Sequence, residues 1–188
     1  MKKTNVRSMV GIALLIAIVV VLQLLGQFIK LGPMVSVSLV LLPIVIGAAF
    51  YGPGAGAILG FAFSVVVLLQ PDTAFFYGMS VIGTVVTVLV KGTLCGWLAG
   101  LVYRALEKKN TLLGVVFSAI ICPIVNTAIF FAGCCTFFLK PLAASGVENV
   151  PFYVITVFIG FNFIAEFLVN VLCCPIIVRL LQIVKKNV

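Results

Sequence analysis

Three polar side chains recur at four-residue intervals in a strongly apolar stretch, FIGFNFIAEFLVN, residues 158–170. They are Asn162, Glu166 and Asn170. Residues four apart lie on nearly the same face of a helix, so the spacing predicts a polar stripe with one carboxylate between two amides. A carboxylate that faces lipid costs about 2.5–3.5 kcal/mol on insertion scales. We therefore expect Glu166 to face a polar partner or a polar cavity.

A second polar stripe lies earlier in the chain, with spacings of four, three and four. Its members are Ser80, Thr84, Thr87 and Lys91. A third apolar segment carries Asn126. Counting about 1.5 Å per residue from the expected outer end of each segment places Lys91, Asn126 and Glu166 at a similar depth of about 20 Å. The sequence thus predicts that three helices bring polar groups to one level.

The residue types in this polar layer favour binding over catalysis. The sequence has no histidine, which excludes a histidine-based metal site or proton relay, and it has no HExxH, GxSxG or Walker A motif. We predict that the protein is not an enzyme and needs no metal or cofactor. A buried polar stripe on two helices is typical of a pocket for a polar small molecule. The alternative is a structural Lys91–Glu166 bridge, with the asparagines joining helices.

Composition shows which elements must hold these groups in place. The chain has 188 residues, of which 64% are hydrophobic and only 9% charged, and its mean hydropathy is +1.38. Globular domains hold about 45–50% apolar and about 25% charged residues. The apolar runs are continuous and do not alternate as in a membrane barrel. We predict an all-α integral membrane protein that forms a single domain, residues 1–188.

A helix needs roughly 20 apolar residues to cross a bilayer. Six segments qualify, which predicts a compact bundle of six transmembrane helices, near residues 8–29, 35–51, 54–70, 78–104, 111–139 and 152–182. The second and third segments are short and are joined by YGPGAG. The first is read as a retained helix, because no cleavage site follows its apolar run. The longest loops, about 69–78 and 140–151, fall on the outer side.

Basic residues predict the orientation of this bundle. With six spans, nine of them lie on one side: Lys2, Lys3, Arg7, Arg104, Lys108, Lys109, Arg179, Lys185 and Lys186. The other side has only two lysines, which are accompanied by two acidic residues: Lys30, Lys140, Asp72 and Glu148. The positive-inside rule places both termini in the cytoplasm. Topology explains the net charge of +8, so nucleic acid is not an expected partner.

Small residues recur at helical spacing in three places. The rows are Gly52, Gly56 and Gly60; Gly92, Gly96 and Gly100; and the pair Ala13 and Ala17. Such rows let helix backbones approach closely in a membrane. We expect the glycine rows to pack within the bundle, and the alanine pair either to do the same or to face a partner protein.

Prolines and cysteines complete the sequence features. Pro43, Pro123 and Pro175 fall within the second, fifth and sixth predicted spans, where we expect each to bend its helix. The six cysteines include the adjacent pairs 134–135 and 173–174 but no CxxC motif. Adjacent cysteines seldom bridge each other, so small buried apolar side chains are the expected role.

Four runs of sequence carry a family resemblance. LLPIVIGAAFYGPGAGAILG, VKGTLCGWLAGLVYR, CPIVNTAIF and NFIAEFLVN, together with six compact spans and the Ala13-xxx-Ala17 pair, resemble the substrate-binding S components of energy-coupling factor (ECF) vitamin transporters. The resemblance covers nearly the whole chain.

This resemblance implies a prokaryotic plasma-membrane protein that captures a vitamin from outside and is not itself an ATPase. Its implied partners are a membrane coupling protein, the T component, and two cytoplasmic ATPases. Ala13 and Ala17 would meet the T component, and loaded S components would topple in the membrane to release the vitamin. The implied pocket lies among spans four to six and the outer loops. This location agrees with the substrate-binding residues that we expect from the polar stripes: Thr84, Thr87, Lys91, Asn126, Asn162, Glu166 and Asn170.

The chain looks most like the pantothenate-type branch of the family. Lys91 would meet the pantothenate carboxylate, while the amides and threonines serve its amide and hydroxyls. Glu166 would either compete for Lys91 or accept from a hydroxyl while orienting the lysine. Riboflavin is the main rival ligand, with phenylalanines as stacking walls. A membrane scaffold protein is the alternative of another class, and a membrane enzyme or a channel is a third.

Overall fold

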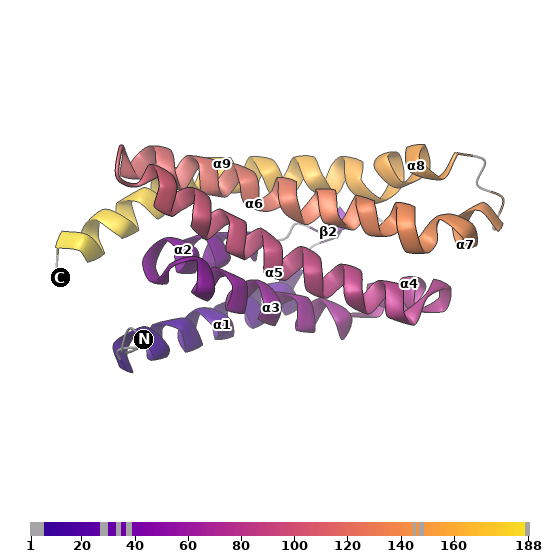
Figure 1. Ribbon diagram of the computed structural model, residues 1–188, viewed down its shortest axis with the longest axis horizontal. Helices are drawn as coiled ribbons and strands as arrows, with labels where there is room; N and C mark the ends of the chain where they lie inside the picture. The colour runs from indigo at the N-terminus through magenta and orange to yellow at the C-terminus, as the bar shows by residue number, and fades with distance from the viewer. Residues whose placement is uncertain are drawn as a thin grey trace.

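The computed structural model describes residues 6–26, 30–32, 35–36, 39–144, 146 and 149–186 of the chain. Lys2, Lys3 and Glu148, which the charge analysis used, lie outside these residues. The described chain is helical apart from short connections and one two-stranded sheet (Figure 1). The elements, in order, are α1 (Val6–Gly26), β1 (Lys30–Gly32), β2 (Val35–Ser36), α2 (Leu41–Tyr51), α3 (Pro53–Leu68), η1 (Pro71–Thr73), α4 (Ala74–Met79), α5 (Val81–Leu106), α6 (Thr111–Gly133), η2 (Cys134–Phe138), α7 (Leu139–Ala144), α8 (Val150–Tyr153), η3 (Val154–Ile159) and α9 (Gly160–Lys186).

Several of these helices are long and apolar enough to cross a membrane. Within the described residues, α1, α5 and the continuous helix Thr111–Ala144 qualify by length and composition. α3 meets the same criteria only when it is joined with the segment Pro71–Met79, and the two helices are bent by 75° at the break between them. The helical membrane class predicted from the sequence is therefore confirmed, whereas the count of six spans stays a prediction.

The second predicted span differs most from the structure. We expected a helix from about residue 35, but Val35–Ser36 forms β2, which pairs antiparallel with β1, and α2 begins at Leu41. α2 has 11 residues and is thus about 16 Å long, well short of a hydrocarbon core of about 30 Å. Pro43 falls in the first turn of α2. Backbone N–H groups of the first turn have no acceptor within the helix, so a proline there removes no helical hydrogen bond. Our expectation that Pro43 bends a helix interior was wrong, whereas Pro123 and Pro175 do lie inside helices.

The outer loops predicted from sequence contain helical structure of their own. The loop near 69–78 holds the 3-10 turn η1 and the short helix α4. The helix that starts at Thr111 continues through the π-helical segment η2 into α7, beyond the expected end at 139. Figure 1 shows the start of α1, the α5–α6 turn and the end of α9 at the same end of the bundle. These are the three segments whose basic residues the charge analysis grouped on one side.

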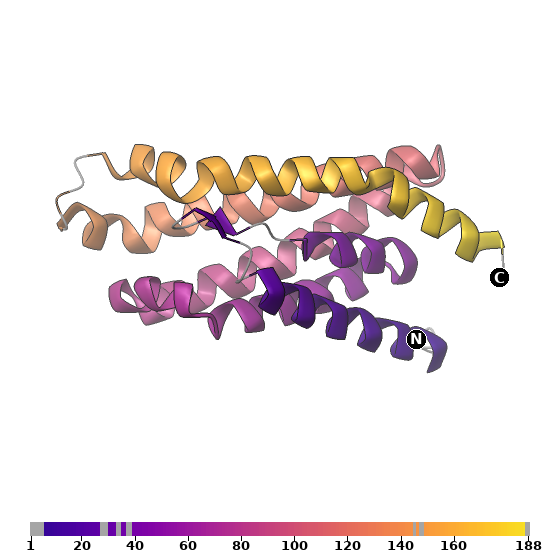
Figure 2. The same ribbon diagram turned by 180° about the vertical axis from the view of Figure 1, so that it is seen from behind.

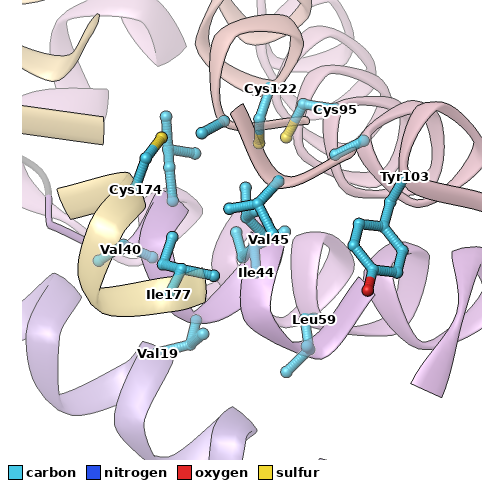
Figure 3. Packing of buried hydrophobic residues seen from close by; sticks show 14 of the residues in the cluster. Val19, Val40, Ile44, Val45, Leu59, Cys95, Tyr103, Cys122, Cys174 and Ile177 are labelled. Atoms are coloured by element: carbon cyan, nitrogen blue, oxygen red, sulfur yellow. The ribbon is translucent and has the colours of Figure 1, made fainter. Parts of the chain in front are cut away.

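The helices pack side by side in the order α1, α3, α5, α6 and α9 (Figures 1 and 2). α2 lies inside this arrangement and contacts all five. Figure 3 shows Ile44 and Val45 of α2 surrounded by apolar side chains of the neighbouring helices. Both residues are fully buried. α2 is thus the centre of the apolar core in the half of the bundle that holds the chain ends.

A second apolar cluster closes the opposite end. Its buried members come from η2, α7, α8 and η3: Cys134, Phe138, Leu142, Val150 and Val154. Phe76 of α4 packs against this cluster, and its ring centroid lies 5.4 Å from that of Phe138. The bundle therefore has two apolar clusters, one around α2 and one near the α7–α8 connection.

The two glycine rows form a seam between α3 and α5. A Cβ added to Gly56 would collide with the carbonyl of Gly96, and one added to Gly60 would collide with the carbonyl of Gly92. Ser64 joins the same helices, because its Oγ donates to the Val88 carbonyl at 2.7 Å. The packing role predicted for the glycines is confirmed. The six cysteines are all free, and four of them are buried.

Candidate functional site

α5 and α6 run antiparallel, and their contacts fix which residues share a level. Toward the end of the bundle away from the chain ends, Thr87 of α5 packs directly against Gly133 of α6, where any side chain would collide with the threonine. Near the other end, the Ser118 Oγ of α6 donates to the Ala99 carbonyl of α5 at 2.8 Å. Small residues thus bring the two helices together at two separate levels.

Lys91 points into the bundle between these helices and α3. Its Nζ lies 5.2 Å from the ring centroid of Phe130 on α6 and 6.0 Å from that of Phe63 on α3. Both distances are within the range of a cation–π attraction. The sequence analysis did not anticipate these aromatic neighbours. The available signal was that Phe130 lies one helical turn from Asn126.

Lys91 marks the boundary between the two apolar clusters. Phe63 belongs to the cluster around α2, and Phe130 packs against the second apolar cluster, near the α7–α8 connection. The Phe130 ring also packs edge-on against Phe76, with 5.6 Å between centroids. A charged group therefore lies between the two apolar clusters.

The outer members of the α5 stripe form hydrogen bonds within their own helix. Ser80 is the N-cap of α5, and its Oγ accepts from the Gly83 amide at 3.1 Å. Thr84 is 1% exposed and donates its hydroxyl proton to the Ser80 carbonyl at 2.8 Å. The Thr84 oxygen keeps its capacity to accept, but its proton is used by the helix.

Thr87 and Asn126 have different surroundings. They are 4% and 7% exposed, and neither Thr87 Oγ1 nor Asn126 Oδ1 has a hydrogen-bond partner among the described residues. Buried polar atoms in native proteins nearly always have a partner, which is protein, water or ligand. Thr87 lies one turn from Lys91 in the direction away from the chain ends, and Asn126 lies one turn from Phe130 in the direction toward them. The two unpartnered atoms therefore bracket the level of the lysine.

The third predicted wall is α9, which carries Asn162, Glu166 and Asn170. Leu112 of α6 and Val178 of α9 line the same groove. These helices run antiparallel. Equal numbers of residues counted from this pair, away from the chain ends, therefore lead to Asn126 on α6 and to a position between Asn162 and Glu166 on α9.

The side chains of Asn162 and Glu166 lie outside the part of the chain that the structure describes. Their convergence with Lys91 therefore stays a prediction. Asn170 is fully buried one turn closer to the chain ends, and its carbonyl accepts from Cys174 Sγ at 3.3 Å. Asn170 thus lies on the inner side of the layer that contains Lys91 and Asn126.

The predicted partner residues lie on an exposed face of α1. Ala13 and Ala17 are both exposed, and the neighbouring Leu14 is 63% exposed. Val19 is the one buried residue of α1 in the described structure. Gln23 of α1 connects this helix to the segment just after α3, because its Nε2 donates to Gln70 Oε1 at 3.0 Å. An apolar helix face with small residues is therefore available for contact with lipid or another protein.

The described residues contain no group of three or more His, Cys, Asp or Glu side chains that could hold a metal ion. The polar layer offers an ammonium, a hydroxyl, an amide and aromatic rings. These groups can bind and orient a polar molecule.

The fold and this buried polar layer define the class as a multi-pass helical membrane protein with polar groups between its helices. A protein-family model described as the substrate-specific component of ECF transporters matches residues 7–178. The chain belongs to this family, which makes it the substrate-binding subunit of an ECF importer. Members of the family work with a T component and ATPases on a small-molecule substrate. Searches of curated proteins and of solved structures gave no significant match.

Proposed function

We propose that this S component captures a water-soluble vitamin from outside the cell, and that pantothenate is the best candidate. The observation that carries the proposal is the pair of buried, unpartnered atoms, Thr87 Oγ1 and Asn126 Oδ1, on either side of Lys91. An unpartnered buried polar atom costs about 1–3 kcal/mol. A ligand that hydrogen-bonds to both atoms would remove this cost and gain affinity.

The functional groups of pantothenate match this layer. Its carboxylate would meet the Lys91 ammonium in a charge-assisted hydrogen bond. Its hydroxyls and amide N–H would donate to Asn126 Oδ1 and Thr87 Oγ1, with Thr84 as a further acceptor. On α9, we assign Asn162, Glu166 and Asn170 to the same site, with Glu166 accepting from a ligand hydroxyl and orienting the lysine.

Riboflavin is the second candidate, because aromatic rings lie at the outer edge of the layer. Phe130 packs against Phe76 edge-on, and Lys91 lies over the Phe130 ring. A flat heteroaromatic ligand can stack in such surroundings.

Delivery of the vitamin would follow the scheme of the family. In our proposal the six spans place both termini in the cytoplasm of a prokaryotic cell. Ala13 and Ala17 on the exposed face of α1 would contact the T component, because small side chains let a partner helix approach closely. Two cytoplasmic ATPases would drive release.

Titration of the purified protein with pantothenate and with riboflavin tests the proposal. We expect saturable binding of one vitamin, and a loss of at least tenfold in affinity for Lys91→Ala. Ser118→Ala is the matched control, because Ser118 is a buried polar residue of the same α5–α6 contact whose hydroxyl is already bonded to the Ala99 and Gly114 carbonyls. Wild-type affinity in Lys91→Ala would remove the site assignment.

A further inference from the structure

We propose that the groove between the inner ends of α6 and α9 binds an anionic phospholipid, with an acyl chain in the groove and the phosphate at a basic rim. The site is separate from the polar layer and does not depend on which vitamin is bound. It depends on the predicted orientation, in which this end of the bundle faces the cytoplasm.

The groove has the size and chemistry for part of an acyl chain. Its volume is about 240 Å³, and its lining is entirely apolar: Leu112, Val116, Val171, Cys174, Pro175 and Val178. Cys174 and Val178 are 4% and 7% exposed and form the floor, whereas Leu112 is 51% exposed at the edge. Hydrocarbon is the occupant that such a surface favours.

Pro175 accounts for the presence of the groove. It lies inside α9, where a proline removes a backbone hydrogen bond and clashes with the preceding turn. Figure 2 shows α9 running along α6 and then changing direction toward its C-terminal end. The helices therefore separate where a straight α9 would have stayed packed against α6.

Exposed basic residues lie close in sequence to two of the groove residues, Leu112 and Val178. Lys108 and Lys109 are exposed just before α6, and Arg179 is exposed next to the groove residue Val178. α6 also begins here, with Asn110 as its N-cap, and the start of a helix favours an anion. Glu107 is the one described acidic residue in this turn, so the basic groups outnumber it.

The two features together select the ligand class. A soluble anion would use the rim but not the apolar groove, and a neutral lipid would use the groove but not the rim. An anionic phospholipid uses both. Anionic headgroups lie on the cytoplasmic leaflet, and basic residues near that surface attract them.

Native mass spectrometry of the purified full-length protein tests this proposal, with phosphatidylglycerol and phosphatidylcholine of identical chains as probes. We expect phosphatidylglycerol to bind about tenfold more tightly, since basic side chains act at the rim. The double variant Lys109→Gln/Arg179→Gln should lose this preference and keep vitamin binding. Val116→Phe should fill the groove and weaken both lipids.

The matched control is Lys140→Gln, which removes an exposed lysine of α7 at the opposite end of the bundle and should leave the preference unchanged. Three results would overturn the proposal. They are equal binding of the two lipids to the wild-type protein, an intact preference in the double variant, and displacement of phosphatidylglycerol by excess inorganic phosphate, which has no acyl chain.

Discussion

Replacement of Asn126 by leucine should separate the stability of the protein from its affinity for the vitamin. Asn126 is 7% exposed, and its Oδ1 has no hydrogen-bond partner among the described residues. Leucine is similar in size and has no polar atom. The substitution removes an unpartnered buried acceptor, which costs about 1–3 kcal/mol. We therefore expect the ligand-free Asn126→Leu variant to be as stable as the wild type, or more stable by about 1 kcal/mol.

Affinity should change in the opposite direction. If a ligand donor normally bonds to Asn126 Oδ1, the variant leaves that donor buried without an acceptor. The loss of about 1–3 kcal/mol corresponds to an affinity that is weaker by about fivefold to about 140-fold, at about 1.4 kcal/mol per tenfold. Denaturant unfolding without vitamin, together with a binding titration, measures both quantities. Ser118→Ala should instead lower stability by about 1 kcal/mol and leave affinity unchanged, because its hydroxyl bonds within the protein.

The reasoning would be refuted if ligand-free Asn126→Leu were destabilised by more than about 1 kcal/mol, since the amide would then make a structural contribution in the empty protein. Unchanged vitamin affinity in the same variant would refute the assignment of Asn126 to the site.

Three further predictions concern other residues of the bundle. Gly60→Ala should lower the free energy of unfolding by about 1–3 kcal/mol in a denaturation assay, because its Cβ would collide with the Gly92 carbonyl. Gly54→Ala, whose Cβ meets no atom within 4 Å, should be neutral in the same assay. Equal effects of the two substitutions would contradict the glycine seam between α3 and α5. Ala17→Trp should abolish co-purification with the T component and spare vitamin binding, and normal assembly of this variant would count against the α1 interface. Phe130→Leu should weaken vitamin binding severalfold in a titration, because it removes one of the rings that position the Lys91 ammonium; wild-type affinity would show that the ring has no such role.

The features that the sequence predicted well depend on residue type more than on three-dimensional register. Continuous apolar runs require helices in a bilayer, whatever their packing. The rows through Gly56 and Gly96 predicted a close helix contact because glycine alone permits it, and the structure has that contact. Depth counting places Lys91 and Asn126 at similar levels, because the rise of a helix is constant, and this placement stays a prediction.

The errors occurred where hydropathy alone was used. The run VSVSL at residues 35–39 alternates apolar and polar residues, which is the period of a strand, yet its apolar content was assigned to a helix. The start of α2 at Leu41 was missed for this reason. The aromatic contacts of Lys91 also escaped prediction, because they depend on the register of α3 and α6 against α5, which no local pattern encodes.

Mass spectrometry of the vitamin that co-purifies with the protein tests the central claim most directly, namely that the polar layer of α5, α6 and α9 holds the ligand. We predict that the wild type retains a vitamin, with the mass of pantothenate as the first candidate, and that Lys91→Ala and Asn162→Ala both lose it while remaining folded. Retention of the vitamin at wild-type occupancy in both variants would contradict the account.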